Sequence, residues 1–263
     1  MNLRYVLADP TKNVTALIKT PVAPAQRRRA ADAILRAEPA CEQVGFVFRD
    51  ENGAPCLRMT GGEFCGNASI SAAALYCAEE GLPPGETRAL SLDVSGARGP
   101  VRVRVTANGK NAFACEIRMP LPLRISEERL TLNGREFRLP VVYFPGIAHC
   151  IAPEALFTPA EAELAVRQWC AHLGTRGFGL MLTDGRSLSL RPLVYIPAAD
   201  TLFWERSCAS GTCAVGACVS RAREKTVDLT VNQPGGTLRI RASADALLLS
   251  GGVTLAEEKQ IVL

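Results

Sequence analysis

The sequence predicts an α+β fold made of two similar halves. Short segments in which apolar and polar residues alternate occur throughout the chain, as half-buried strands require, and the clearest is Val-Arg-Val-Arg-Val at 101–105. The order of predicted strands and helices repeats after Pro120-Leu121-Pro122, a candidate crossover between domains. We therefore expect an N-terminal half at residues 1–119, completed by a last strand at 256–263, and a C-terminal half at 120–255.

Local patterns predict the elements of the first half. Asp-Glu-Asn-Gly at 50–53 is a favourable turn and joins two strands. An amphipathic helix is expected at 23–37, and a second helix at 68–80 ends at Gly81. The predicted strands are 3–8, 14–18, 44–49, 56–60, 90–94, 101–106 and 112–118.

The helix expected at 68–80 differs from an ordinary surface helix. Its residues 68–78, Ala-Ser-Ile-Ser-Ala-Ala-Ala-Leu-Tyr-Cys-Ala, are small or apolar and carry no charge. A helix without a polar face is buried, so we expect strands to surround this one.

The second half repeats the arrangement, with a lateral helix at 159–173 and a small-residue helix at 210–223. The strands expected there are 136–143, 147–152, 178–183, 187–195, 201–205, 227–232, 237–241 and 246–249. The chain closes with a strand near 261–263, which we assign to the first half.

Composition indicates a soluble globular protein. The 263 residues are 48% hydrophobic and 21% charged, and the net charge of +4 gives no nucleic-acid footprint. The run Arg27-Arg28-Arg29 is interpreted as the solvated face of a helix. No apolar run could span a bilayer, and residues 1–14 lack the apolar core of a signal peptide. We therefore expect a cytoplasmic protein with reduced thiols and no membrane partner.

Two of the ten cysteines occupy matching settings. Cys65, in Glu63-Phe64-Cys65-Gly66-Asn67, and Cys208, in Ser207-Cys208-Ala209-Ser210-Gly211, each follow a predicted strand and precede a run of small, helix-compatible residues. A thiol at a helix N-terminus faces unpaired N–H groups and the positive end of the helix dipole, which favours the reactive thiolate. The pair predicts two reactive thiols, one in each half.

Most of the other cysteines are interpreted as small buried hydrophobic residues, with Cys213 among them. A metal site is not expected. Cys208, Cys213 and Cys218 are five residues apart, which turns each about 140° from the last on a helix, so they cannot converge on one ion. The chain also lacks a CxxC pair.

Two thiols can invert an amino-acid α-carbon without a cofactor. The α-proton is weakly acidic, so its removal needs a base in reach and stabilisation of the developing charge. Inversion also needs a second group that delivers a proton to the opposite face. One thiolate and one thiol meet both needs, and N–H groups of Gly66, Asn67, Ala209 and Ser210 would hold the substrate carboxylate.

The two cysteine motifs resemble those of the diaminopimelate-epimerase-like superfamily, whose members racemise or epimerise amino acids without pyridoxal phosphate. The resemblance covers nearly the whole chain. It implies two barrel-like, mostly antiparallel sheets, each around a central helix, with the active site in the cleft between the halves. It also implies catalysis by Cys65 and Cys208, substrate binding by Asn13 and Gln43, and a turn that carries His149.

Departures from the superfamily's pattern affect the substrate. Ile147 stands where an Asn that reads the distal end of diaminopimelate is expected, and Glu205-Arg206 lies immediately before Ser207-Cys208. The form of the two motifs is closer to the histidine-racemase branch, which supplies D-histidine for opine-type metallophores. The resemblance thus favours histidine, with diaminopimelate or another amino acid as alternatives.

Several side chains near the cysteines remain open to two interpretations. Glu205 either pairs with an arginine or binds the substrate amine and affects the Cys208 thiol. His149 is either a satisfied core histidine or a group that tunes Cys208. Glu63 is interpreted as a structural carboxylate, and Gly61-Gly62 as a tight turn or a hinge.

The same residues argue against other classes of protein. A non-catalytic binding protein on this fold would have no need of both thiols, and the related isomerases that use a carboxylate lack matched cysteines. Proline-racemase-like enzymes also use two thiols, but their local motifs fit less well. The expected partner is an amino acid, with no cofactor, no metal and no nucleic acid, and a homodimer is left open.

Overall fold

The computed structural model describes residues 1–184 and 188–263, so residue 187, the start of the strand expected at 187–195, lies outside them. The chain divides into two compact units, Met1–Arg118 with Ser250–Leu263, and Met119–Leu249. Strand β16, Leu247–Leu255, contributes to both. The sequence analysis assigned residues 250–255 to the C-terminal half, whereas they join the first unit because the end of β16 pairs with β1.

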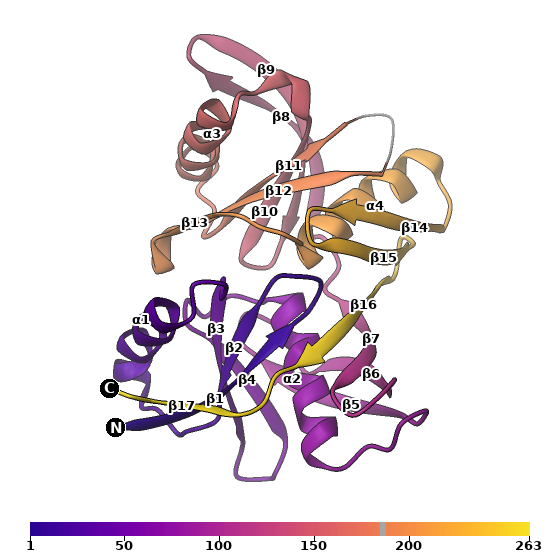
Figure 1. The fold of residues 1–263 in the computed structure, drawn as a ribbon. Coiled ribbons are helices and arrows are strands. Elements are labelled where there is room, and N and C mark those ends of the chain that lie inside the picture. The colour runs from indigo at the N-terminus through magenta and orange to yellow at the C-terminus, as the bar shows by residue number, and fades with distance from the viewer. Residues whose placement is uncertain (185–187) are drawn as a thin grey trace. The chain divides into compact units, whose positions relative to one another are not determined.

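The first unit is a closed eight-stranded barrel (Figure 1). Its strand order is β16-β7-β6-β5-β4-β3-β2-β1, and β16 also pairs with β1, which closes the ring. The pairs β2–β3 and β4–β5 are parallel. The strands are β1 (Asn2–Asp9), β2 (Thr15–Ile18), β3 (Gln43–Arg49), β4 (Pro55–Met59), β5 (Thr87–Val94), β6 (Val101–Ala107) and β7 (Ala112–Met119), and β17 (Lys259–Val262) pairs with residues 2–5 of β1.

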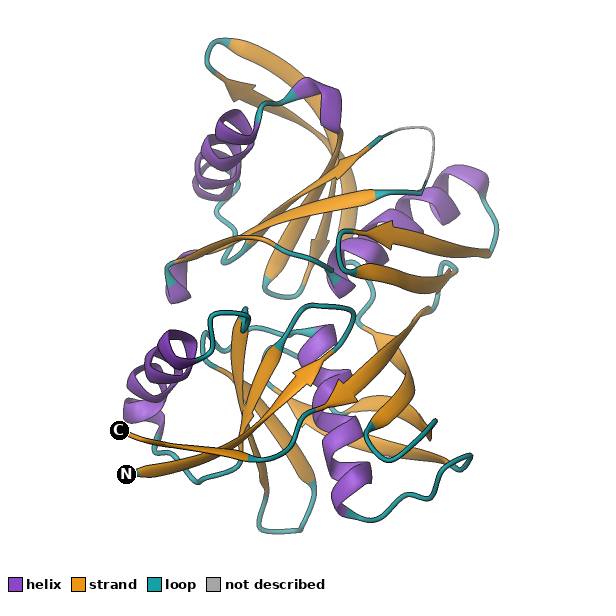
Figure 2. Ribbon diagram, viewed as in Figure 1, coloured by secondary structure: helices purple, strands orange, loops and turns teal. Residues whose placement is uncertain are grey.

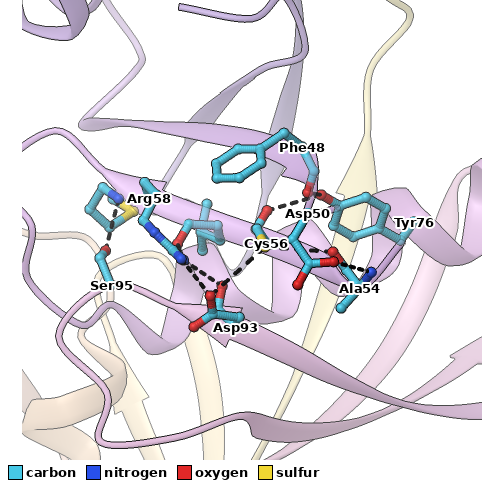
Figure 3. A network of polar contacts seen from close by, with 10 residues as sticks. Phe48, Asp50, Ala54, Cys56, Arg58, Tyr76, Asp93 and Ser95 are labelled. Carbon is cyan, nitrogen blue, oxygen red and sulfur yellow. Dashed lines mark hydrogen bonds and ion pairs between the residues drawn. The ribbon is translucent and has the colours of Figure 1, made fainter. Parts of the chain in front are cut away.

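Helix α2, Gly66–Glu79, lies among these strands, and every residue from 66 to 77 is buried. It contacts β2, β4, β5 and β6, as its uncharged sequence predicts. Near its C-terminal end the Tyr76 hydroxyl lies 2.7 Å from the carbonyl oxygen of Phe48 and 2.9 Å from that of Cys56 (Figure 3). These contacts tie the C-terminal end of the helix to the β3–β4 hairpin.

Outside the barrel, helix α1, Arg27–Ala37, follows a short 3₁₀ turn at Pro24–Gln26. Its buried residues Ala30, Ala31 and Ile34 pack on a cluster that includes Leu3 and Phe46. The predicted amphipathic helix therefore covers one face of the barrel with its apolar side.

The second unit contains a six-stranded sheet in the order β13-β12-β11-β10-β9-β8 and a hairpin, β14–β15, whose strand β15 is also hydrogen-bonded to β16 (Figure 2). Helix α3, Pro159–His172, packs on the sheet through Trp169, whose indole N–H donates to the Thr131 carbonyl at 2.9 Å. Helix α4, Ala209–Arg223, packs on the hairpin and also contacts β9 and β10. The strands are β8 (Arg124–Leu132), β9 (Arg135–Phe144), β10 (Ile147–Pro153), β11 (Phe178–Thr183), β12 (Leu190–Ile196), β13 (Thr201–Trp204), β14 (Val227–Gln233) and β15 (Gly236–Ala242).

Strand β8 was not predicted. Its sequence, Arg-Ile-Ser-Glu-Glu-Arg-Leu-Thr-Leu, is rich in charge, and most of its side chains are partly or fully exposed. It forms a hairpin with β9 through Asn133 and Gly134, whose φ angles are 49° and 75°. Asn-Gly with two positive φ angles is the preferred two-residue hairpin turn, so this dipeptide was the available signal.

Together the two units confirm a mixed α+β fold with a barrel. Within the described residues, none of the helices has the length and apolar character needed to cross a bilayer.

Candidate active site

Cys65 is the N-cap residue of α2, with φ −127° and ψ 116°. Its sulfur accepts the Ala68 N–H at 3.4 Å, which satisfies one of the unpaired donors of the first helical turn. The same sulfur lies 3.2 Å from Oε1 of Gln43 and donates to it. The side chain is half-buried, so the thiol has both a donor and an acceptor within reach.

Three predicted binding residues gather at this end of α2. Gln43 Nε2 donates to Asn13 Oδ1 at 2.6 Å, and Asn67 Nδ2 donates to the same oxygen at 3.0 Å. Sequence reasoning missed two further members, Glu42 and Thr15. Asn13 Nδ2 donates to Glu42 Oε2 at 2.5 Å, and Gln43 Nε2 also donates to Thr15 Oγ1 at 2.9 Å.

The missing signal for Thr15 is strand register. Thr15 and Gln43 are direct partners in the parallel β2–β3 pair, which brings their side chains together across 28 positions of sequence. No local motif reveals such a pairing. Glu42 directly precedes Gln43, which the sequence identified as a binding residue, so this adjacency was the available clue.

Cys208 is the N-cap residue of α4 and repeats the backbone geometry of Cys65, with φ −127° and ψ 112°. Its sulfur accepts the Gly211 N–H at 3.4 Å and lies 3.6 Å from the Ser210 hydroxyl. Unlike Cys65, Cys208 is buried. Burial, followed by the nearby Glu205 carboxylate, raises the pKa of the Cys208 thiol well above its ordinary value.

Gln233, at the end of β14, holds the backbone around Cys208 and was not predicted. Its Oε1 accepts the Cys208 N–H at 2.7 Å, and its Nε2 donates to Thr212 Oγ1 at 2.9 Å. The Thr212 hydroxyl in turn donates to the Cys208 carbonyl at 2.7 Å. The first turn of α4 is thereby fixed to the hairpin, with Ala209 and Ser210 as its first residues.

His149 projects from β10 and is fully buried. Its Nε2 lies 2.8 Å from the Ser210 hydroxyl, and that hydroxyl lies 3.6 Å from the Cys208 sulfur. Ser210 thus stands between His149 and Cys208. Among the described residues Nδ1 has no hydrogen-bond partner, and it lies against Gly179, where a Cβ would come within 2.3 Å of it. Burial lowers the His149 pKa to about 3, so the ring is neutral near pH 7.

Glu63 lies two residues before Cys65. Burial raises the pKa of its carboxyl, and Oε2 is buried without a hydrogen-bond partner among the described residues. Its backbone carbonyl accepts a hydrogen bond from the Ser95 hydroxyl at 2.9 Å, which holds the loop that leads into α2.

Within residues 1–184 and 188–263, His, Cys, Asp and Glu side chains form no group of three or more suited to a metal ion.

Each unit therefore presents a cysteine at the N-terminus of a buried helix, with polar side chains around it. Such a sulfur can exchange a proton, and the N–H groups beside it can bind an anion. A sequence profile described as the histidine racemase CntK N-terminal domain matches residues 2–262 of the chain. The chain belongs to this histidine racemase family. It is therefore an isomerase, and the resemblance seen in the two cysteine motifs is confirmed.

Relatives of this family match along almost the whole chain. A histidine racemase of Fusobacterium nucleatum is 31% identical over 268 residues, which cover 99% of this chain and 97% of the relative. A histidine racemase of Staphylococcus aureus is 28% identical over 242 residues, covering 88% and 85% of the two chains.

Solved structures share the fold at low identity. A probable proline racemase of Agrobacterium radiobacter K84 superimposes with a TM-score of 0.74 at 13% identity, covering 99% of this chain and 93% of the other. A hydroxyproline epimerase of Agrobacterium vitis gives 0.69 at 12% identity, with 100% and 93% covered. The racemase and epimerase fold thus extends beyond the histidine racemase family.

Proposed function

We propose that the protein racemises histidine by proton transfer at the α-carbon, with Cys65 and Cys208 as the acid and base. The observation that carries this proposal is their shared geometry. Each caps a buried helix, each has the same extended backbone conformation, and each sulfur accepts the N–H three residues later. Two helices in different units have no structural need for the same unusual cap, since Ser, Thr, Asp and Asn are the preferred N-cap residues.

The proposed step balances as two proton transfers. A thiolate removes the α-proton from one face and becomes a thiol, while the other thiol gives its proton to the opposite face and becomes a thiolate. The enzyme is left in the complementary protonation state, ready for the other enantiomer. Backbone N–H groups of Gly66, Asn67, Ala209 and Ser210 bind the substrate carboxylate and stabilise the negative charge that develops on it.

Glu205 takes the substrate ammonium group in this proposal. Its carboxylate is close enough to Cys208 to raise the pKa of that thiol. A bound ammonium offsets the negative charge, so arrival of the substrate makes the Cys208 thiolate easier to form. The base would then be generated only when there is a proton to remove.

Histidine is proposed as the substrate because both relatives described above are histidine racemases and match most of this chain's length. Ile147 supports the choice over diaminopimelate, because an apolar side chain cannot hydrogen-bond a distal carboxylate. The D-histidine formed would serve the synthesis of an opine-type metallophore.

The test is a circular dichroism assay of L-histidine and of diaminopimelate with the wild-type protein, Cys65→Ser and Cys208→Ser. We expect racemisation of histidine without added pyridoxal phosphate, and a loss of at least about 10³-fold in each variant because each removes one of the two proton carriers. Cys218→Ser, a half-buried position on α4 away from the N-terminus, is the matched control and should retain activity.

Turnover in D₂O gives a second readout. Thiols exchange their protons with solvent, so the product enantiomer should carry deuterium at the α-carbon. Near-normal turnover in either serine variant, or full retention of the substrate hydrogen, would contradict the two-thiol mechanism. A protein that bound histidine but exchanged no α-proton would be a binding protein instead.

A further inference from the structure

We infer that Glu42 is a positioning residue that fixes the direction of a hydrogen-bond chain and thereby holds Cys65 as the protonated thiol before substrate binds. The chain runs from Glu42 through Asn13 and Gln43 to Cys65, entirely within the first unit. Its meaning for catalysis rests on the proposed function, but the protonation state it assigns can be measured separately.

Glu42 sets the orientation of Asn13. An ionised carboxylate only accepts hydrogen bonds, so the Asn13 group 2.5 Å from Glu42 Oε2 is the NH₂. The Asn13 Oδ1 must then face the other way, where it accepts from the amides of Gln43 and Asn67. Asn13 is 2% exposed, so water is not at hand to substitute for these partners if the amide turns over.

Thr15 fixes the next amide a second time. The Thr15 hydroxyl donates to the backbone carbonyl of Asn13 at 3.3 Å. Its own oxygen, Oγ1, is therefore left to accept from Gln43 Nε2. Both hydrogens of Gln43 Nε2 are thus used, one on Asn13 and one on Thr15. The Gln43 amide cannot present its NH₂ to the cysteine, and Oε1 faces the sulfur instead.

The consequence falls on Cys65. Oε1 carries no proton, so the 3.2 Å contact is a hydrogen bond only if the sulfur supplies one. A thiolate would face a carbonyl lone pair at 3.2 Å, whereas the contact from the Ala68 N–H is longer, at 3.4 Å. At Cys208 the Gly211 N–H and the Ser210 hydroxyl can both donate to the sulfur, and the acceptor facing the thiol is the Glu205 carboxylate, which the substrate ammonium neutralises in the proposed function. Cys65 is therefore the acid in the first turnover, and Cys208 becomes the base once the bound ammonium offsets the charge of Glu205.

The experiment follows the rate of iodoacetamide alkylation at Cys65 from pH 6 to pH 10, by mass spectrometry of the peptide that contains it. Only the thiolate reacts, so the rate reports its fraction. Gln43→Met keeps the side-chain length and removes the acceptor. We expect the midpoint of its pH profile to fall by about one unit, which is about tenfold faster alkylation at pH 7.

Glu42→Gln should act in the same direction and less strongly, about threefold at pH 7, because Asn13 can then adopt either orientation while Thr15 still restrains Gln43. The double variant should match Gln43→Met alone, because Glu42 acts only through Gln43. Glu38→Gln is the control. It removes a carboxylate that contacts Tyr5 and Lys259 and takes no part in the hydrogen-bond chain, so it should leave the pH profile of alkylation unchanged.

Three outcomes overturn the inference. An unchanged profile in Gln43→Met shows that the carbonyl does not hold the proton. An unchanged profile in Glu42→Gln removes Glu42 from the mechanism, and undiminished acceleration by Glu42→Gln in the Gln43→Met background shows a direct charge effect on the thiol. If Glu42→Gln does not fold, as judged by far-UV circular dichroism, Thr15→Val tests the same chain and should also accelerate alkylation.

The alkylation profile does not depend on turnover. Loss of the two-thiol mechanism would appear as racemisation by a serine variant, whereas loss of this inference appears as one of the three alkylation results. Either can fail while the other stands.

Discussion

Burial of His149 should lower the free energy of unfolding at acidic pH. In the unfolded chain its imidazole titrates near pH 6.5, whereas in the folded protein burial lowers the pKa to about 3. The unfolded state therefore binds the extra proton between these values, and stability falls as the pH drops below about 6.5. At pH 5 the loss from this one group is about 2 kcal/mol, and above pH 7 it vanishes.

His149→Gln should remove that dependence, because Gln does not titrate and can still reach the Ser210 hydroxyl. Urea unfolding at pH 7 and pH 5 should show about 2 kcal/mol less loss in the variant than in the wild-type protein. His172, exposed in the last turn of α3, gives the matched control His172→Gln, which should lose as much as wild type. Equal losses in His149→Gln and wild type would show that His149 does not stay neutral.

Single residues also mark how far the sequence predicts the site. Cys65 and Cys208 were found because each lies between a strand and a run of small residues, and the structure places both at helix N-termini. Gln233 and Thr15 were not found, because they reach the site through strands distant in sequence. A local sequence pattern identifies a residue whose position depends on its sequence neighbours. It does not identify a residue that strand pairing brings to the site from a distant part of the sequence.

The two special helices have cysteine where other residues cap better. At α3 the cap is conventional: the Thr158 hydroxyl accepts the Glu161 N–H, and the Glu161 carboxylate accepts the Thr158 N–H. At α2 and α4 the sulfur takes the place of that hydroxyl. Serine in the same position would preserve the contact and alanine would abolish it.

We therefore expect Cys65→Ala to be about 1 kcal/mol less stable than Cys65→Ser, with the same order at Cys208. Urea unfolding compares each pair, and Thr158→Ala against Thr158→Ser gives the size of an ordinary cap in this chain. Equal stability of the Ser and Ala variants at both positions would mean that the sulfur contacts contribute nothing to the helices. The comparison also separates lost racemisation from lost folding.

The predicted elements matched where one pattern dominated and failed where two competed. The uncharged sequence of α2 left no alternative to burial, so its place among strands was predictable. Strand β16 was ended too early, at residue 249, because Gly251 and Gly252 resemble a break. The strand continues because its last residues pair with Ala8 and Asp9, a partner at the opposite end of the chain.

The first unit is discontinuous in sequence, since residues 1–118 are completed by residues 250–263. The C-terminal strand β17 pairs with β1 from Asn2↔Val262 to Tyr5↔Lys259, and Lys259 also contacts Glu38. The second unit, by contrast, is one continuous segment, 119–249. The two units should therefore respond differently to changes at the C-terminal end.

Deletion of residues 256–263 should weaken the first unit alone. Amide hydrogen exchange should show lost protection in β1 and β2, while β9, β10 and β11 keep theirs. Both tryptophans, Trp169 and Trp204, lie in the second unit, so their fluorescence should be unchanged in the truncated protein. Lys259→Ala retains the strand without the ion pair and should leave β1 protected. Equal loss of protection in both units would contradict independent stabilisation.

Closure of the barrel by β16 also has a consequence for synthesis. A ribosome releases residues 1–118 first, including all of α2, but the partners of Ala8 and Asp9 are made only after the whole second unit. While the whole second unit is translated, the apolar helix α2 must therefore stay inside a barrel that lacks its closing strand. A nonsense mutation just after codon 249 would still encode every residue of the second unit, yet it would deprive Cys65 of the closed barrel that holds it.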